Sequence, residues 1–192
     1  MTKLVLFNGP PRSGKNTAAN MLQPVIPFDT KIIGYSHHLK RSVHAIYLGS
    51  GGWDLDPDVF DAVKDEPQEI LGGRSWRQMY ICYSEHVFKV LHGKDWLGKQ
   101  HTLESIKHQL VLVPDSGFVE EAESSATTFS PDNILLYRIH CEGTSYVGDS
   151  RSYIDLSHIG VLTYDIVNIP GHPEVMREEI YELTIPWLMN HT

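Results

Sequence analysis

Residues 3–17 read Lys3-Leu4-Val5-Leu6-Phe7-Asn8-Gly9-Pro10-Pro11-Arg12-Ser13-Gly14-Lys15-Asn16-Thr17. The short apolar run from Leu4 to Phe7 is typical of a central parallel strand that is covered on both faces. Gly9 and Gly14 bound a loop, and Lys15 follows directly, as in the phosphate-binding pattern G-x-x-x-x-G-K. The stretch therefore predicts a strand, a phosphate-binding loop and the start of a helix.

Each residue type in this loop suits contact with a polyphosphate. Glycine lets the backbone approach the phosphates closely, and the amides of residues 13–17 can point inward as a nest of donors. The following helix presents its positive N-terminal end, and the ammonium group of Lys15 can reach the β- and γ-phosphates. The candidate nucleotide contacts in the loop are Gly9, Arg12, Ser13, Gly14, Lys15, Asn16 and Thr17.

The loop departs from the strict pattern at the position after the lysine. Asn16 stands where GTPases and motor ATPases carry the hydroxyl that holds Mg2+, and the hydroxyl comes one residue later, at Thr17. The order G-K-x-T is similar to that of small nucleoside monophosphate kinases. Pro10 and Pro11 lack amide donors, so the phosphates must be held by the amides that remain.

The composition predicts one soluble globular domain of 192 residues, with 41% hydrophobic and 21% charged residues. The net charge of −8 argues against a general nucleic-acid or anionic-membrane surface. The N-terminus leads into a core strand rather than a signal peptide, so we expect Cys82 and Cys141 to be free thiols in a reducing cytoplasm. The eleven histidines lack metal-site spacing, and we expect no metal cluster among them.

Periodicity and turn residues predict alternating strands and helices without a linker. Strands are expected at 4–7, 31–35, 108–113, 133–140 and 164–169. Helices are expected at 14–22, 36–48, 75–92, 93–107, 119–125 and 173–189, with a polar loop at 124–132. Ser36 and Ser75 are the expected caps of two of these helices. Two apolar stripes predict that helix 75–92 is buried over much of its circumference.

Basic residues in the first half of the chain are candidates for binding a monophosphate. Arg74 and Arg77 lie at the expected N-terminal end of helix 75–92, where two guanidinium groups suit a phosphate. Lys40 and Arg41 either form a solvated helix face or point to an incoming phosphate, and Lys64 is a further candidate.

Two later positions are candidates for the reaction centre. Asp115 follows the strand expected at 108–113, at the carboxyl edge where open α/β sheets bind ligands. It can order Mg2+ through water, contact an acceptor, or cap the helix that follows. The segment 141–153 is rich in glycine and serine, which predicts either a mobile flap or a plain surface loop. As a flap, it would bring the positive charge of Arg151 to a transferring group.

Together these motifs resemble the bacteriophage deoxynucleoside monophosphate kinases, within the P-loop nucleoside monophosphate kinase superfamily. The resemblance covers nearly the whole chain, and only the phosphate loop is specific on its own. Its anchors are Gly9 to Thr17, Lys64-Asp65-Glu66-Pro67, Gly72-Gly73-Arg74-Ser75-Trp76-Arg77-Gln78, Gly93-Lys94-Asp95, Pro114-Asp115-Ser116-Gly117-Phe118, Gly148-Asp149-Ser150-Arg151-Ser152-Tyr153 and Asp165-Ile166-Val167-Asn168.

The resemblance implies a three-layer α/β/α P-loop kinase fold, with a five-stranded parallel sheet in the order 2-3-1-4-5. One domain would span residues 1–192, with a helical acceptor-binding insertion at about 36–100 and a short lid at about 141–153. Lys15 and Thr17 would contact ATP phosphates and Mg2+, and Asp115 would lie at the catalytic strand end. Arg138 and Arg151 would flank the lid, and Asn168 would border the adenine.

The implied function is transfer of the ATP γ-phosphoryl group to a (deoxy)nucleoside 5′-monophosphate, with Mg2+ as the metal. The expected partners are small nucleotides rather than nucleic acid or membrane, and a homodimer is left open. The expected location is the cytoplasm, or the host cytoplasm for a phage-encoded chain. Two alternatives stay open: a kinase of another small acceptor, such as dephospho-coenzyme A, and a nucleotide-binding protein without turnover.

Overall fold

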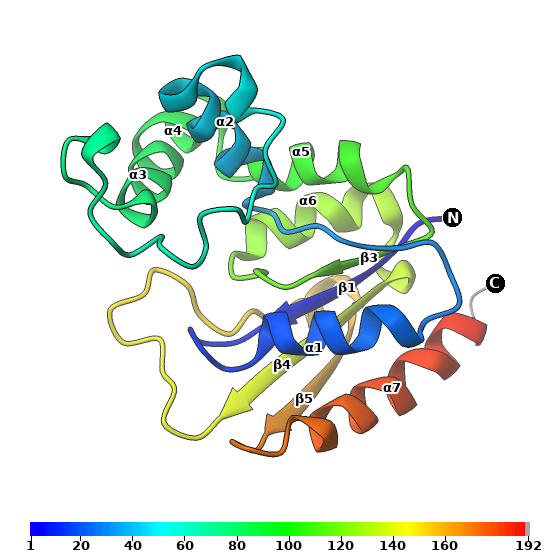
Figure 1. Cartoon of the computed structure of the whole chain (residues 1–192). Coiled ribbons are helices and arrows are strands. Elements are labelled where there is room, and N and C mark those ends of the chain that lie inside the picture. The colour runs from blue at the N-terminus through cyan, green and yellow to red at the C-terminus, as the bar shows by residue number, and fades with distance from the viewer. Residues whose placement is uncertain (191–192) are drawn as a thin grey trace.

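A five-stranded, entirely parallel sheet forms the centre of the computed structural model, which describes residues 1–190 (Figure 1). The strand order is β2-β3-β1-β4-β5, which confirms the predicted fold class. The strands span Lys3–Asn8 (β1), Thr30–Ile32 (β2), Leu110–Val113 (β3), Ile134–Cys141 (β4) and Leu162–Asn168 (β5). Because β1 lies between β3 and β4, the phosphate loop emerges from the middle of the sheet.

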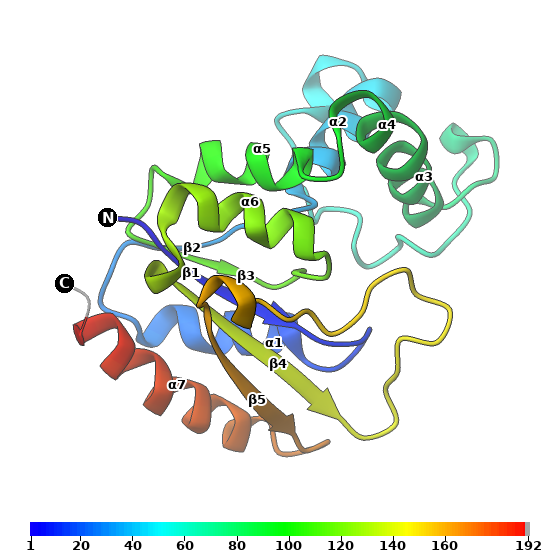
Figure 2. The ribbon, with the colours of Figure 1, turned by 180° about the vertical axis from the view of Figure 1, so that it is seen from behind.

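Helices cover both faces of this sheet and complete a three-layer α/β/α arrangement. Helices α1 and α7 pack together on one face, and α5 and α6 lie on the other (Figures 1 and 2). The helices span Lys15–Leu22 (α1), His37–Leu48 (α2), Trp76–Tyr83 (α3), Lys89–His92 (α4), Trp96–Ser105 (α5), Val119–Phe129 (α6) and Pro173–Asn190 (α7). The crossovers from β1 to β2, from β2 to β3 and from β3 to β4 carry α-helices, whereas the crossover from β4 to β5 holds only a short 3-10 turn at Ser157–Ile159.

The apolar run of β1 is buried on both sides of the sheet. Leu4 and Leu6 face the core beneath α6, whereas Val5 and Phe7 face the core beneath α1 and α7. All four side chains are 0% exposed, as the continuous apolar run predicted. Asn8 ends the strand and is also fully buried, so its amide must find partners inside the protein.

Helices α2 to α5 lie between β2 and β3 and form a separate lobe with its own core, visible at the top of Figure 1. Trp76 stacks on Phe60 with ring centroids 4.4 Å apart. His44 is fully buried in this core, and its Nε2 atom lies 2.7 Å from the hydroxyl of Tyr80. Aromatic packing thus holds the lobe together at the position predicted for the insertion.

Two expectations about helices were wrong. The loop predicted at 124–132 is largely helical, because α6 continues to Phe129 and buries Ser125 and Phe129. Ser125 and Thr127 hydrogen-bond to the carbonyls four residues earlier, which lets short polar residues remain in the helix. The apolar spacing of the final helix also predicts that Val175 is buried, but this side chain is 44% exposed.

The helix predicted at 75–92 begins as expected, with a capping box between Ser75 and Gln78. A π-helical turn at Ser84–Phe88 then separates α3 from α4. Of the second apolar stripe, formed by Ile81, Cys82 and Phe88, the first two residues are exposed and only Phe88 is partly buried. Val90 and Leu91, at the end of the first stripe, are also exposed. The lobe is therefore a thin layer that covers one side of these helices.

Within residues 1–190, no helix combines the length and apolar content that a bilayer span requires.

Helices α5 and α6 are in close contact at Gly98. A Cβ atom there would lie 2.5 Å from the backbone oxygen of Glu121. We predict that Gly98→Ala lowers the free energy of unfolding by about 1–3 kcal/mol, because this overpacking outweighs the better helix propensity of alanine. Urea unfolding followed by circular dichroism would measure this change. Gly51→Ala is the matched control, since that glycine faces open space, and equal effects of both substitutions would contradict the prediction.

Candidate functional site

The phosphate loop connects β1 to α1 and holds Lys15 in a buried position. The Nζ atom of Lys15 donates hydrogen bonds of 2.6 Å to the carbonyl oxygens of Gly9 and Pro10. Burial, and to a lesser extent the nearby positive charge of Arg151, lower the pKa of Lys15 to about 8. The loop thus holds a cation whose charge only carbonyl dipoles compensate directly, and an anion placed there would be stabilised.

The backbone of the loop takes uncommon conformations, one of which lets Asn168 approach closely. Gly14 has a φ of 103°, and a Cβ atom there would collide with the side chain of Asn168. The amide of Asn168 donates a 3.0 Å hydrogen bond to the carbonyl of Ser13, so β5 supports the loop from below. Arg12 has a φ of 65°, which is uncommon for a residue with a side chain.

Polar groups in the loop remain open to a nucleotide. The Oγ atom of Ser13 is buried and has no hydrogen-bond partner among residues 1–190. Asn16 and Thr17 lie in the first turn of α1, where backbone amides lack helical acceptors. An orphan hydroxyl, free amides and a buried cation together fit a polyphosphate.

Asp115 follows β3 and fixes the start of the helical lobe. Its carboxylate accepts hydrogen bonds from the backbone amides of Tyr35, at 2.8 Å, and Ser36, at 2.9 Å. Burial alone would raise the pKa of Asp115, but hydrogen bonds from Ser36 and the charges of His37 and Lys40 outweigh it and lower the pKa. The carboxylate is therefore ionised and anchors the N-terminal end of α2.

This anchoring differs from two expectations for helix caps. Ser36 occupies the N-cap position of α2, but its side chain makes no capping bond to the helix. Asp115 does not cap the helix that follows it, because α6 begins after Phe118 without a side-chain cap. Asp115 instead binds the amides that lead into α2, a contact across 80 residues that local sequence patterns do not show.

The segment predicted as a lid runs without regular structure from the end of β4 past the phosphate loop, in yellow in Figure 1. Arg151 is partly buried and forms a two-pronged ion pair with Asp149, with Nε–Oδ1 and Nη2–Oδ2 distances of 2.9 and 2.6 Å. A Cβ atom at Gly117 would lie 2.5 Å from the Cδ atom of Arg151. The side chain of Arg151 therefore packs against the turn that carries Asp115, with its charge close enough to affect Lys15.

Asn8 belongs to the site, although the sequence analysis did not single it out. Its Nδ2 atom lies 2.9 Å from the Ser116 carbonyl, 3.0 Å from the Ser152 carbonyl and 3.2 Å from the Tyr146 hydroxyl. Its Oδ1 atom accepts a hydrogen bond of 3.1 Å from the amide of Ile154. A polar residue at the end of an apolar strand, directly before the glycine loop, was the available signal.

Most of the predicted acceptor-binding cations are already neutralised by carboxylates within the lobe. Lys40 contacts Asp58 and lies 2.9 Å from Asp61, which also pairs with Lys64 at 2.8 Å. Arg41 is held by both oxygens of Glu104, at 3.0 and 3.1 Å, and Arg77 pairs with Asp65. An incoming phosphate would have to replace one of these carboxylates.

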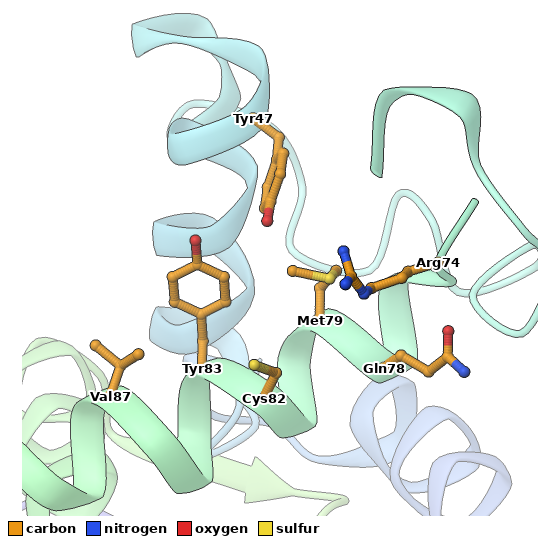
Figure 3. A pocket seen from close by; sticks show the side chains of 7 residues that line it. All are labelled: Tyr47, Arg74, Gln78, Met79, Cys82, Tyr83 and Val87. Carbon is orange, nitrogen blue, oxygen red and sulfur yellow. The ribbon is translucent and has the colours of Figure 1, made fainter. Parts of the chain in front are cut away.

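Arg74 is the predicted acceptor residue that forms no ion pair within the described part of the chain. It lines a surface pocket of about 620 Å³ between α2 and α3, together with Tyr47, Gln78 and Met79 (Figure 3). The pocket is lined by no residue of the phosphate loop, of the turn after β3 or of the lid segment. We therefore do not assign this pocket to the reaction centre, despite its size.

Arg138 lies apart from Arg151. It projects from β4 and pairs with Asp165 of β5, with Nε–Oδ1 and Nη2–Oδ2 distances of 3.0 and 2.5 Å. His140 contacts the same carboxylate at 2.6 Å. The carboxyl edge thus gathers Lys15, Asp115 and Arg151 on one side, whereas Arg138 lies on the edge formed by β4 and β5.

Oxygen ligands for Mg2+ are few. Within residues 1–190, no three His, Cys, Asp or Glu side chains gather into a metal-binding group. The hydroxyl of Thr17 in the first turn of α1 is free to serve, whereas both oxygens of Asp115 already accept backbone hydrogen bonds. This donor set fits an Mg2+ ion that arrives with nucleotide phosphates and retains water. It does not fit a stand-alone metal site.

Glu121 in the first turn of α6 is buried, at 2% exposure, beside this edge. Burial, with a smaller contribution from the negative charge of Asp115, raises its pKa to about 8. Between the ordinary glutamate pKa and pH 8, the folded chain keeps a proton that the unfolded chain has lost. Stability therefore falls as pH rises through this range.

We predict that Glu121→Gln removes this pH dependence. The stability of the variant relative to the wild type should increase between pH 5 and pH 8 by at least about 1.4 kcal/mol, which corresponds to a tenfold change in the folding equilibrium. Urea unfolding at each pH would measure it. Glu182→Gln, at an exposed position of α7, is the control. A constant difference between Glu121→Gln and wild type across this range would contradict the assigned protonation.

Comparison of the chain with protein-family models found no match, and comparison with curated protein sequences found none either.

Proposed function

We propose that the chain is an ATP-dependent (deoxy)nucleoside monophosphate kinase. The observation that carries the proposal is the placement of the glycine loop and Lys15 at the centre of a 2-3-1-4-5 parallel sheet, opposite Asp115 and Arg151. A helical lobe borders one side of this edge and an irregular lid segment the other (Figure 2). Binding two phosphate-bearing substrates requires such an arrangement, with one binding region on each side of a shared cationic centre.

In the proposed reaction, an acceptor phosphate oxygen attacks the γ-phosphorus of ATP in line with the leaving ADP oxygen. Little covalent chemistry falls to the protein, which positions the substrates and compensates charge. Lys15 would shift from the Gly9 and Pro10 carbonyls to the phosphates. Arg151 would turn its guanidinium from Asp149 to the transferring group, whose equatorial oxygens suit the same two-pronged geometry.

The hydroxyl of Thr17, and Asp115 through water, would hold Mg2+, which would supply positive charge that compensates the charge developing on the phosphates. The acceptor would lie towards the helical lobe, where Lys40, Lys64 and Arg77 are held by aspartates. Exchange of a carboxylate for the acceptor phosphate keeps these cations paired throughout. The aspartates thus hold the side chains in an anion-binding geometry before the substrate arrives.

The direct test is ADP release from Mg-ATP with a panel of nucleoside and deoxynucleoside monophosphates, dephospho-coenzyme A, and no acceptor. Release that depends on particular monophosphates would support the proposal and identify the substrates. Dependence on dephospho-coenzyme A alone would replace the acceptor class, and release without acceptor would indicate an ATPase. Nucleotide binding without any release would favour the alternative of a binding protein without turnover.

Lys15 gives a prediction for catalysis. Lys15→Ala should lower kcat by at least about 10², a loss typical of removing one electrostatic contact from the transition state. Steady-state kinetics would measure it, with circular dichroism to show that the variant is folded. Near-wild-type turnover in the folded variant would remove the phosphate loop from the mechanism.

Lys15 also gives a prediction for nucleotide binding. Its pKa of about 8 in the free protein should rise when phosphates bind, so binding above pH 8 takes up a proton. The affinity for ADP should therefore fall as pH rises from 8 to 9.5, by up to about tenfold per pH unit. Isothermal titration calorimetry in two buffers would measure both affinity and proton uptake. In Lys15→Arg, which stays charged, affinity should be independent of pH; the same decline in both proteins would contradict the prediction.

A further inference from the structure

Asn8 connects three segments that are far apart in the sequence. It ends β1 and lies beside the carboxyl edge of the sheet, where it is 0% exposed. Its Nδ2 atom contacts the carbonyl of Ser116 in the turn after β3. The same atom contacts Tyr146 and Ser152 in the segment between β4 and β5, and its Oδ1 atom accepts a hydrogen bond from Ile154 in that segment. A single side chain therefore connects the lid segment to the strand that carries the phosphate loop, beside the hydrogen bond of the Tyr153 hydroxyl to Ile139 and the burial of Ile154 in the core.

These contacts surround Arg151 closely. Ser152, whose carbonyl accepts a hydrogen bond from Asn8, is the next residue in the chain. Ile154, whose amide donates to Asn8, lies two residues further on. The side chain of Arg151 is confined on its other side by Gly117, which follows Ser116 in the turn that Asn8 also binds. The backbone and the side chain of Arg151 are thus held from both directions.

We propose that Asn8 is a positioning residue that fixes Arg151 over the phosphate loop before any substrate binds. This role rests on the proposed kinase function, in which Arg151 compensates charge on the transferring phosphoryl group. Residues 152–154, which follow Arg151, are bonded to the last residue of β1, and Tyr146 in the turn at 141–150 contacts the same side chain. The backbone beside Arg151 would therefore stay in place while its guanidinium turns from Asp149 to the transferring group.

The contacts require an amide. Two carbonyl oxygens, from Ser116 and Ser152, face the Nδ2 atom, and one backbone N–H, from Ile154, faces the Oδ1 atom. An aspartate would place a carboxylate against both carbonyls, and a leucine would remove the partner of all three groups, of which those of Ser116 and Ile154 belong to buried residues. An unsatisfied buried donor or acceptor is costly, so either substitution should release the segment from β1.

Trypsin, which cleaves after arginine, gives a readout that does not depend on activity. In the wild-type chain the backbone after Arg151 is pinned and should be resistant. In Asn8→Leu, cleavage at Arg151 should be faster by about tenfold, because local opening of the segment becomes easier. Asn133→Leu is the matched control: Asn133 is also buried, but its amide donates to the carbonyl of Phe129, the last residue of α6. Unchanged cleavage at Arg151 in folded Asn8→Leu, or equal acceleration in the control, would overturn the proposal.

Steady-state kinetics test whether Asn8 acts on catalysis through Arg151, with the acceptor that the panel of monophosphates identifies. Asn8→Leu should lower kcat by at least about tenfold, with the KM for ATP changed less than about threefold, because it disturbs a contact made in the transition state. Its effect should largely disappear in the Arg151→Ala background, since the residues act through each other. Full additivity of the two substitutions would overturn the proposal.

Gly117→Ala provides a second variant if Asn8→Leu fails to fold. It leaves the hydrogen bonds of Asn8 in place but displaces the side chain of Arg151, so kcat should fall without faster cleavage at Arg151. An unchanged kcat would show that the position of Arg151 is irrelevant. If the wild-type chain phosphorylates no acceptor, the proposed function fails, while the protease experiment still decides whether Asn8 holds the segment.

Discussion

The carboxylate of Asp115 is the contact on which the arrangement of the site depends. It binds the two amides that precede α2, so the helical lobe starts from a point fixed to β3. The same five-residue turn offers Ser116 to Asn8 and Gly117 to Arg151. Lobe, phosphate strand and lid segment are therefore positioned relative to one turn, and a shift of that turn would disturb all three together.

Charge in this molecule is arranged in pairs rather than as a broad field. The chain carries a net charge of −8, yet the helical lobe and the segment after β4 hold several cations that are matched with carboxylates. Ion pairs exposed to water add little stability. Their main effect is geometric, because each carboxylate keeps a flexible cationic side chain near the place where a phosphate would need it. In the proposed function a substrate phosphate replaces one of these carboxylates, so the choice between substrates depends on the shape of the binding region rather than on its charge.

Local patterns (apolar runs, glycine spacing and a lysine) were sufficient to predict the strands and the glycine loop, whereas the order of the strands in the sheet was implied by the resemblance to the P-loop nucleoside monophosphate kinases. The sequence was insufficient where long-range packing decides. The exposure of Ile81 and Leu91 depends on how thin the lobe is, and the helix through Ser125 depends on backbone hydrogen bonds that short polar residues make. Likewise, the pairing of Lys40 with Asp58 and the role of Asn8 require knowing which distant segments meet.

The π-helical turn at Ser84–Phe88 has a consequence for how the lobe meets the core. A turn with i→i+5 hydrogen bonds holds one residue more than a regular α-helical turn and rotates everything after it. In this rotated position Phe88 stacks on Trp96 at 4.6 Å, and the Nζ atom of Lys89 lies 3.9 Å from the ring centre of Phe118. The extra residue thus sets the direction in which the side chains after it point. A chain shortened by one residue here would keep its helix but would turn the ammonium group of Lys89 away from Phe118.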